Sequence, residues 1–184
     1  DGGASWDDYG SAQDFVAEED ASDTISLGRE KIIGFAVSPD FQQSGRILFG
    51  RSEGLFSSAD EGLHWHRRNF RPVSHLRGLD VHQDAQGDLW SFGASYGSGT
   101  IVQNLSASTV ELLDAGPMNY QDELILSPQY EEDGMFVVGG ARGLAFWFDP
   151  NKGMNNPHGT LGWEFPPHLG YVRFVAFSPH FDAR

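Results

Sequence analysis

The sequence contains no cysteine, and positive charge is scarce. Without cysteine there are no disulfides and no thiolate metal sites. Lys and Arg number 12 against 26 Asp and Glu, which gives a formal net charge of −14. This acidity excludes a general nucleic-acid or anionic-membrane surface, because both need concentrated positive charge. No run approaches 18 consecutive apolar residues, so the sequence predicts no transmembrane helix.

Glycine and aromatic residues are abundant. The chain has 23 glycines and 9 prolines, and 13% of its residues are aromatic. This composition is typical of many short strands joined by tight turns. No segment shows a helical period with caps. We therefore expect an all-β fold.

A stretch near the N-terminal third of the chain recurs. A shift of 89 residues lays Ser127-Pro-Gln-Tyr130 on Ser38-Pro-Asp-Phe41. The same shift superimposes three glycines and one leucine: Gly134 on Gly45, Gly139 on Gly50, Gly143 on Gly54 and Leu144 on Leu55. A weaker copy fills residues 79–93, about halfway, and a fourth start occurs at residues 175–181. Self-similarity at a fixed period indicates a repeat architecture.

Each repeat is long enough for one blade of a β-propeller, which has four strands. The predicted blades are 31–70, 76–114 and 123–165, with the next blade starting at 172–184. The predicted strands are 31–37, 46–51, 54–58 and 64–70, then 77–82, 88–93, 100–105 and 109–113, then 123–126, 135–139, 143–148 and 161–165, and finally 172–177. Three blades and one strand do not close a ring, so we expect further blades from the same or another chain.

Residues 1–23 differ from the rest of the chain. They are acidic, rich in small residues and without apolar periodicity, which predicts a solvated, flexible arm. The alternative is an arm that docks on a basic partner or on its own propeller. Residues 24–27 read as one short strand. The remaining chain, 24–184, is then the partial propeller.

The segment Ser58-Ala-Asp60-Glu-Gly62-Leu-His-Trp65 is a turn signature. Ser and Asp side chains bond nearby backbone N–H groups, Gly adopts positive φ, and Trp packs beneath. This segment resembles the Asp-box, or BNR repeat, of a β-propeller group that includes sialidases, sortilin-type receptors, certain xyloglucanases and photosystem II assembly-factor-like proteins. The resemblance covers residues 31–181. The resemblance implies that residues 58–65 form a hairpin turn on the rim of the propeller, remote from any active site. It also favours a secreted, periplasmic or lumenal location.

One basic concentration stands out in the acidic chain: His64, His66, Arg67, Arg68, Arg71, His75 and Arg77. Strand alternation predicts His64, His66 and Arg68 on one face and Trp65 and Arg67 on the other. The candidate binding residues for an anion, an acidic partner or the acidic arm are His66, Arg67, Arg68 and Arg71. The alternative is an outer strand that carries solvated charges.

The sequence singles out no catalytic residue, no metal ligands and no cofactor motif. It therefore predicts a non-enzymatic scaffold or assembly subunit that binds a protein or peptide. The alternative is a fragment of a glycan-binding or glycoside-hydrolysing propeller, sialidase-like or xyloglucanase-like. Such an enzyme would show carboxylates or arginines converging at the central channel. A scaffold would instead show an apolar or charged patch on one face.

Overall fold

The computed structural model describes most of the chain between residues 34 and 181. The described residues are 34–51, 54–68, 76–95, 97, 99–107, 109–113, 120–148, 162–164 and 170–181. The predicted acidic arm, the short strand at 24–27, Arg71 and His75 lie outside the described residues. Within the described residues, no helix is long and apolar enough to cross a membrane.

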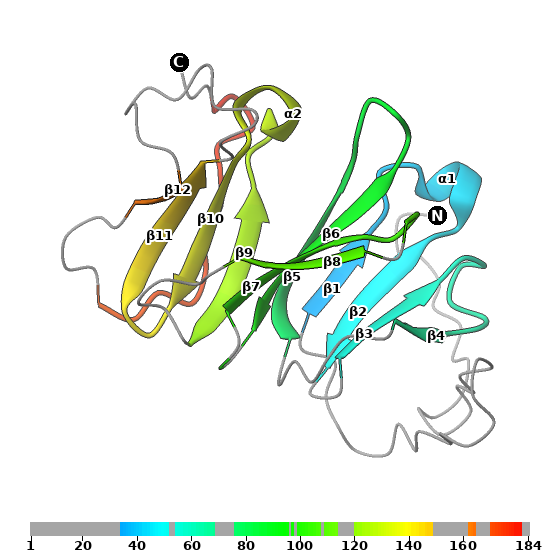
Figure 1. Ribbon diagram of the computed structural model, residues 1–184, viewed down its shortest axis with the longest axis horizontal. Helices are drawn as coiled ribbons and strands as arrows, with labels where there is room; N and C mark the ends of the chain where they lie inside the picture. Colours follow the sequence, from blue (N-terminus) through cyan, green and yellow to red (C-terminus); the bar gives the residue numbers. More distant parts are fainter. Residues whose placement is uncertain are drawn as a thin grey trace, which may run out of the picture.

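The described residues form three antiparallel four-stranded sheets that stand side by side (Figure 1). The first contains β1 (Gly34–Val37), β2 (Ile47–Arg51), β3 (Gly54–Ser58) and β4 (His66–Arg68). The second contains β5 (Leu76–Gln83), β6 (Leu89–Ser95), β7 (Gly99–Asn104) and β8 (Thr109–Leu113). The third contains β9 (Gln121–Leu126), β10 (Met135–Gly140), β11 (Gly143–Phe148) and β12 (Gly162–Glu164). In every sheet the spatial order follows the chain, and the strands fall within the predicted strands or within about two residues of them.

Two single-turn helices were not predicted: α1 (Phe41–Ser44) and α2 (Tyr130–Asp133). A helix of four residues is too short to show a helical period in the sequence. Each ends at a glycine in the left-handed region, with φ of 61° at Gly45 and 62° at Gly134. The N–H of each glycine donates to the first carbonyl of its helix. The two helices are 89 residues apart, so the structure repeats as the sequence does.

Apolar side chains fill the spaces between neighbouring sheets. The cluster between the first and second sheets contains Ala36, Leu48, Leu55, Leu76, Leu79, Val81, Leu89, Ile101 and Leu105. The cluster between the second and third contains Phe92, Ala94, Val102, Leu124, Leu126, Tyr130, Phe136, Val138 and Ala145. These two interfaces hold most of the buried apolar surface that stabilises the described fold.

Glycines let the first strands of successive sheets approach closely. A Cβ built at Gly34 would lie 2.6 Å from the carbonyl oxygen of Arg77, and one at Gly78 would lie 2.4 Å from the backbone nitrogen of Leu124. Real Cβ atoms do not approach other atoms so closely, so only glycine fits at these two positions. The first strands β1, β5 and β9 therefore lie next to one another, with β5 in the middle.

Residues 170–181 lie against the third sheet. The Val172 N–H donates to the Gly140 carbonyl at 3.0 Å, and the Val172 and Val175 side chains lie over Gly139. Phe177 and Phe181 pack with apolar residues of β9, β10 and β11. Residues 172–177, predicted as the first strand of a fourth blade, have no paired strand among the described residues.

Candidate functional site

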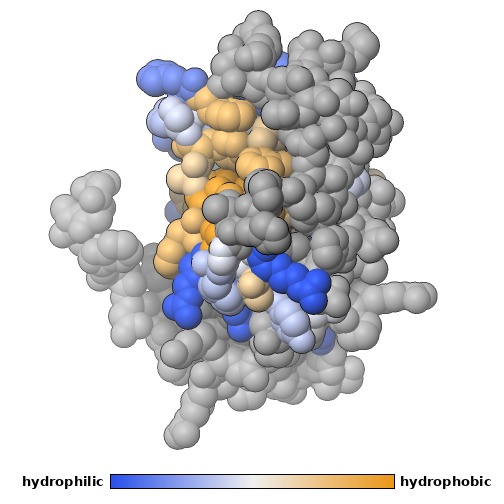
Figure 2. All heavy atoms as spheres, turned by 90° about the vertical axis from the view of Figure 1, so that its left-hand side faces the viewer, coloured by the Kyte–Doolittle hydropathy of each residue, from blue (hydrophilic) through white to orange (hydrophobic). Residues whose placement is uncertain are grey.

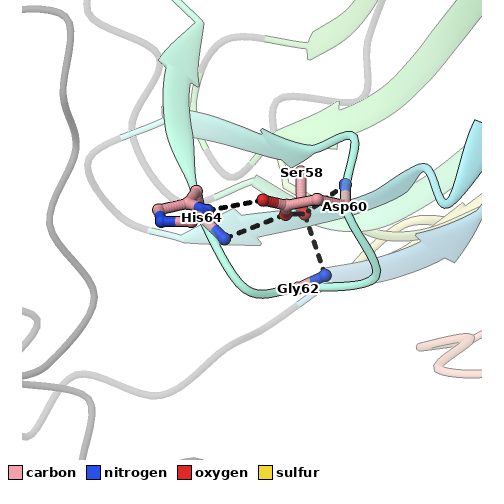
Figure 3. A network of polar contacts seen from close by, with 4 residues as sticks. All are labelled: Ser58, Asp60, Gly62 and His64. Atoms are coloured by element: carbon pink, nitrogen blue, oxygen red, sulfur yellow. Dashed lines mark hydrogen bonds and ion pairs between the residues drawn. The ribbon is translucent and has the colours of Figure 1, made fainter.

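The turn between β3 and β4 is held by the side chains of Ser58 and Asp60 (Figure 3). The Ser58 hydroxyl donates to Asp60 Oδ1 at 2.7 Å and accepts from the Gly62 N–H at 2.9 Å. Asp60 Oδ1 also accepts from the His64 N–H at 2.9 Å, and Asp60 Oδ2 lies 2.5 Å from His64 Nδ1. Gly62 has a φ of 93°, which glycine adopts without strain. These contacts make a closed network within seven residues.

The turn packs on the core, and its hydrogen bonds lower the pKa of Asp60. Trp65 is buried beneath it, and its ring centroid lies 4.4 Å from that of Phe49. The Glu61 N–H donates to the Gly45 carbonyl at 2.9 Å, which ties the turn to the end of α1. The N–H of His64 and the hydroxyl of Ser58 stabilise the Asp60 carboxylate, so the pKa of Asp60 falls to about 2. The network needs the ionised carboxylate.

The candidate binding residues His66, Arg67 and Arg68 form β4, the outermost strand of the first sheet. All three are half-buried. Cross-strand pairing places Arg67 opposite Phe56 and places Arg68 opposite Leu55, so the two arginines point to opposite faces. The Arg68 Nε–H donates to the Ser57 hydroxyl at 2.8 Å. The structure thus divides these residues between two faces, and Arg71 lies outside the described residues.

A polar cluster that the sequence analysis missed joins the second sheet, the third sheet and residues 170–181. The Arg77 guanidinium donates to Asp122 Oδ1, and the Tyr171 hydroxyl donates to Asp122 Oδ2. Arg77 belongs to β5 and Asp122 to β9. Arg173 lies over the Tyr171 ring, 5.4 Å from its centroid. Arg77 was assigned from sequence to the basic group near β4, but it makes this contact at the first strands of the sheets.

Two further carboxylates lie on the same first strands. Asp80 accepts hydrogen bonds from the N–H groups of Val81 and Leu126, so it bridges β5 and β9. Burial raises the pKa of Asp80. Burial also raises the pKa of Glu123, and the nearby charges of Asp80 and Asp122 raise it further. Carboxyl groups therefore gather along β5 and β9, and the pKa values of Asp80 and Glu123 are both raised.

A groove of about 360 Å³ lies between the end of β5 and the turn that contains α2. It is lined by Asp80, Val81, His82, Leu126, Ser127, Pro128, Gln129, Tyr130, Glu131 and Glu132. His82 Nε2 lies 2.6 Å from Glu131 Oε2, and this contact links the second and third sheets at the surface. No group of three or more His, Asp or Glu side chains suited to a metal ion occurs in the described part of the chain.

Comparison with known proteins identifies the fold. No protein-family model matches the sequence, and no curated protein matches it. Among solved structures, the chain is similar to a crystal structure of an ancestral GH74 enzyme, with a TM-score of 0.57 and 15% sequence identity. The similarity covers 82% of this chain and 23% of that enzyme, so the chain spans about a quarter of its length. At this identity the similarity shows the fold alone.

The three sheets are therefore propeller-type blades, as the sequence predicted. No closed ring occurs among the described residues. Their first strands β1, β5 and β9 are the inner strands of the blades. The carboxylates of β5 and β9 thus lie on inner strands, while the turn that holds Asp60 lies on the other side of its blade, next to the outermost strand.

Proposed function

We propose that this chain is a propeller-type interaction module that binds a protein or peptide through exposed aromatic surface. The observation that carries the proposal is the exposure of two aromatic side chains, one on β1 and one in the segment 170–181. Phe35 on β1 is 57% exposed, and Phe174 in the segment against the third blade is 84% exposed. Figure 2 shows apolar residues gathered in a band on the side that carries β9–β12. Exposed apolar surface of this kind marks interaction sites.

The polar clusters fit a structural role within such a module. Both Asp122 oxygens are occupied, one by Arg77 and one by Tyr171. The hydrogen bond to Asp122 raises the pKa of Tyr171, which makes this hydroxyl a poorer nucleophile. In the proposed module these side chains hold neighbouring blades together. The turn around Asp60 is an Asp-box, and its role is to fix the β3–β4 hairpin.

Peptide selection against the intact chain tests the proposal. Peptides selected from a displayed library should bind the wild-type chain and lose most of their affinity for Phe174→Asp, because a charge at this position opposes burial. The matched control is Glu132→Gln, which changes an exposed charge elsewhere and should leave affinity unchanged. Selected peptides that bind Phe174→Asp and Phe35→Asp as well as wild type would refute the use of this aromatic surface.

A glycan-active propeller fragment is the second candidate, and the raised pKa values of Asp80 and Glu123 favour it. A carboxyl with a raised pKa can act as a general acid in glycoside hydrolysis. A glycan array and a panel of fluorogenic glycosides test this candidate. Turnover that Glu123→Gln abolishes would establish the enzyme and would overturn the non-enzymatic proposal.

A further inference from the structure

The groove at the end of β5 has walls from two blades, and all four strands of both blades are described. One wall is the end of β5, and the other runs from Leu126 at the end of β9 through α2. The Leu126 N–H donates to Asp80 Oδ2 at 2.9 Å, which joins the two walls. The buried Tyr130 ring lies edge-on to both His82 and Phe92, with centroid separations of 5.1 Å. Packed side chains therefore shape the groove.

Negative charge dominates the lining of this groove. Three of its ten lining residues are carboxylates, and His82 is the one lining residue that can carry a positive charge. His82 Nε2 lies 2.6 Å from Glu131 Oε2. Within the described part of the chain, only a protonated His82 brings positive charge to Asp80, whose pKa is raised by burial. A cation bound in the groove would offset the cost of burying this carboxylate.

The remaining lining suits an aliphatic stem. Val81, Leu126 and Pro128 supply apolar side chains beside the carboxylates. The volume of about 360 Å³ is near the lower end of the range for ligand pockets, which leaves room for one long side chain. Long basic side chains bury their stems on apolar surface and keep the charged end among polar groups. Arginine also offers five N–H donors in a planar fork that matches carboxylates.

We infer that the groove between the second and third blades binds an arginine side chain from a basic peptide or protein segment. The stem of the arginine lies along the apolar lining, and its guanidinium lies beside Asp80 and Glu131. This inference rests on the proposed interaction function and gives the partner a charge. The net charge of −14 attracts such a partner over a longer range. Neither Phe35 nor Phe174 lines the groove, so the two binding surfaces can be tested separately.

His82 gives this site a pH dependence. The titratable groups around it are Tyr130, Glu131 and Glu132 from α2, and Asp80 and Asp84 from its own blade. Histidine side chains change charge between about pH 5 and pH 8. A protonated His82 adds positive charge to the groove and competes with the guanidinium for Glu131. Arginine should therefore bind more tightly at pH 8 than at pH 6.

The test is an NMR titration of the intact, isotope-labelled chain with N-acetyl-arginine amide at pH 8. The matched ligand is N-acetyl-citrulline amide, which has nearly the same shape and no charge. The arginine ligand should shift the amide signals of Val81, His82 and Gln129 to saturation, and the citrulline ligand should bind about tenfold more weakly. Equal affinities, no saturable shift with arginine, or shifts confined to residues outside the groove would overturn the inference.

Variants of the chain separate the groove from general attraction to an acidic protein. Glu131→Gln removes a partly exposed charge from the groove and should weaken arginine binding about threefold. The matched control is Glu61→Gln, which removes an exposed charge from the first blade and should leave the affinity unchanged. Equal losses in the two variants would overturn the inference.

The pH arm tests the part played by His82. Wild type should bind arginine about threefold more weakly at pH 6 than at pH 8, and His82→Gln should bind equally at both. The same loss at pH 6 in both proteins would overturn the role of His82. If arginine does not bind in the groove while selected peptides still depend on Phe174, the inference falls and the proposed function stands. If selected peptides depend on Glu131 and not on Phe35 or Phe174, the groove stands and the proposed aromatic surface falls.

Discussion

Replacement of Asp60 is the sharpest test of the turn between β3 and β4. Asp60→Ala removes the acceptor of three contacts, from the Ser58 hydroxyl, the His64 N–H and the His64 ring. A hydrogen bond to a charged group contributes about 1.5–3 kcal/mol when buried. The Asp60 side chain is 38% exposed and that of His64 is 62% exposed, so solvent reduces this value. We expect a loss of about 2 kcal/mol in the free energy of unfolding.

That loss has a measurable thermal equivalent. For a chain of this size, 1 kcal/mol corresponds to about 2–4 °C, so Asp60→Ala should lower Tm by about 4–8 °C. Asp60→Asn keeps an oxygen acceptor but loses the charge, and it should lower Tm by about half as much. The control is Glu132→Gln, which removes an exposed charge and should leave Tm within about 1 °C. Differential scanning calorimetry at neutral pH gives all three values.

The pH dependence separates this network from simple packing. The folded pKa of Asp60, about 2, lies below the ordinary value of 3.8. Its contribution is therefore fully present above the ordinary value and is lost as pH falls toward 2. The difference in unfolding free energy between wild type and Asp60→Ala should be present at pH 5 and shrink as pH falls below about 4. A difference independent of pH, or a Tm change under 1 °C, would refute the reasoning.

Substitutions at three other positions should change stability in ways that urea unfolding can measure. Burial raises the folded pKa of Asp80, so ionisation of Asp80 costs stability as pH rises above 3.8. Measured by urea unfolding, the stability of wild type relative to Asp80→Asn should fall from pH 4 to pH 7. A rise in that relative stability would contradict burial as the cause of the raised pKa. Gly78→Ala forces a Cβ to 2.4 Å from the Leu124 nitrogen, and it should cost about 3 kcal/mol or more by urea unfolding. Gly87→Ala adds a methyl group in open space, and only the φ of 85° strains alanine there, so we expect a loss of about 1 kcal/mol in unfolding free energy. Equal losses at Gly78 and Gly87 would contradict the close approach of Gly78 to Leu124.

The sequence predicted the blades because their boundaries are set locally. Serine and aspartate side chains, together with the positive φ of glycine, fix turns within a few residues, and the hydrogen bonds from Ser58 to Asp60 and from the Gly62 N–H to Ser58 are of this kind. Because the sequence repeats, the strands and turns assigned in one copy could be assigned at the matching positions of the next copy. The two single-turn helices escaped prediction because four residues carry no period. Their glycine ends, Gly45 and Gly134, were visible in the sequence as matched positions.

The candidate site was less predictable because it is built between blades. Arg77 and Asp122 are 45 residues apart, and Tyr171 and Asp122 are 49 residues apart. No local pattern pairs them, since contact depends on how one inner strand lies beside the next. The spacing does carry a signal: it is close to one repeat, so residues at the start of successive inner strands are expected to meet. Grouping charged residues by sequence proximity placed Arg77 with β4 instead.

Ser38, Ser127 and Ser178 occupy the same position in three copies of the repeat, so nearby positions can be compared between copies. Four residues before the serine lie Gly34, Glu123 and Phe174, so one repeated position carries a glycine in the first blade, a carboxylate in the third blade and an aromatic ring in segment 170–181. In the first blade the glycine permits close approach of the next inner strand. Glu123 is half-buried with a raised pKa, and Phe174 is 84% exposed. A position whose backbone is fixed and whose side chain varies can change binding without changing the blade. Both candidate functions depend on this position, the glycan-active one through Glu123 and the interaction module through Phe174.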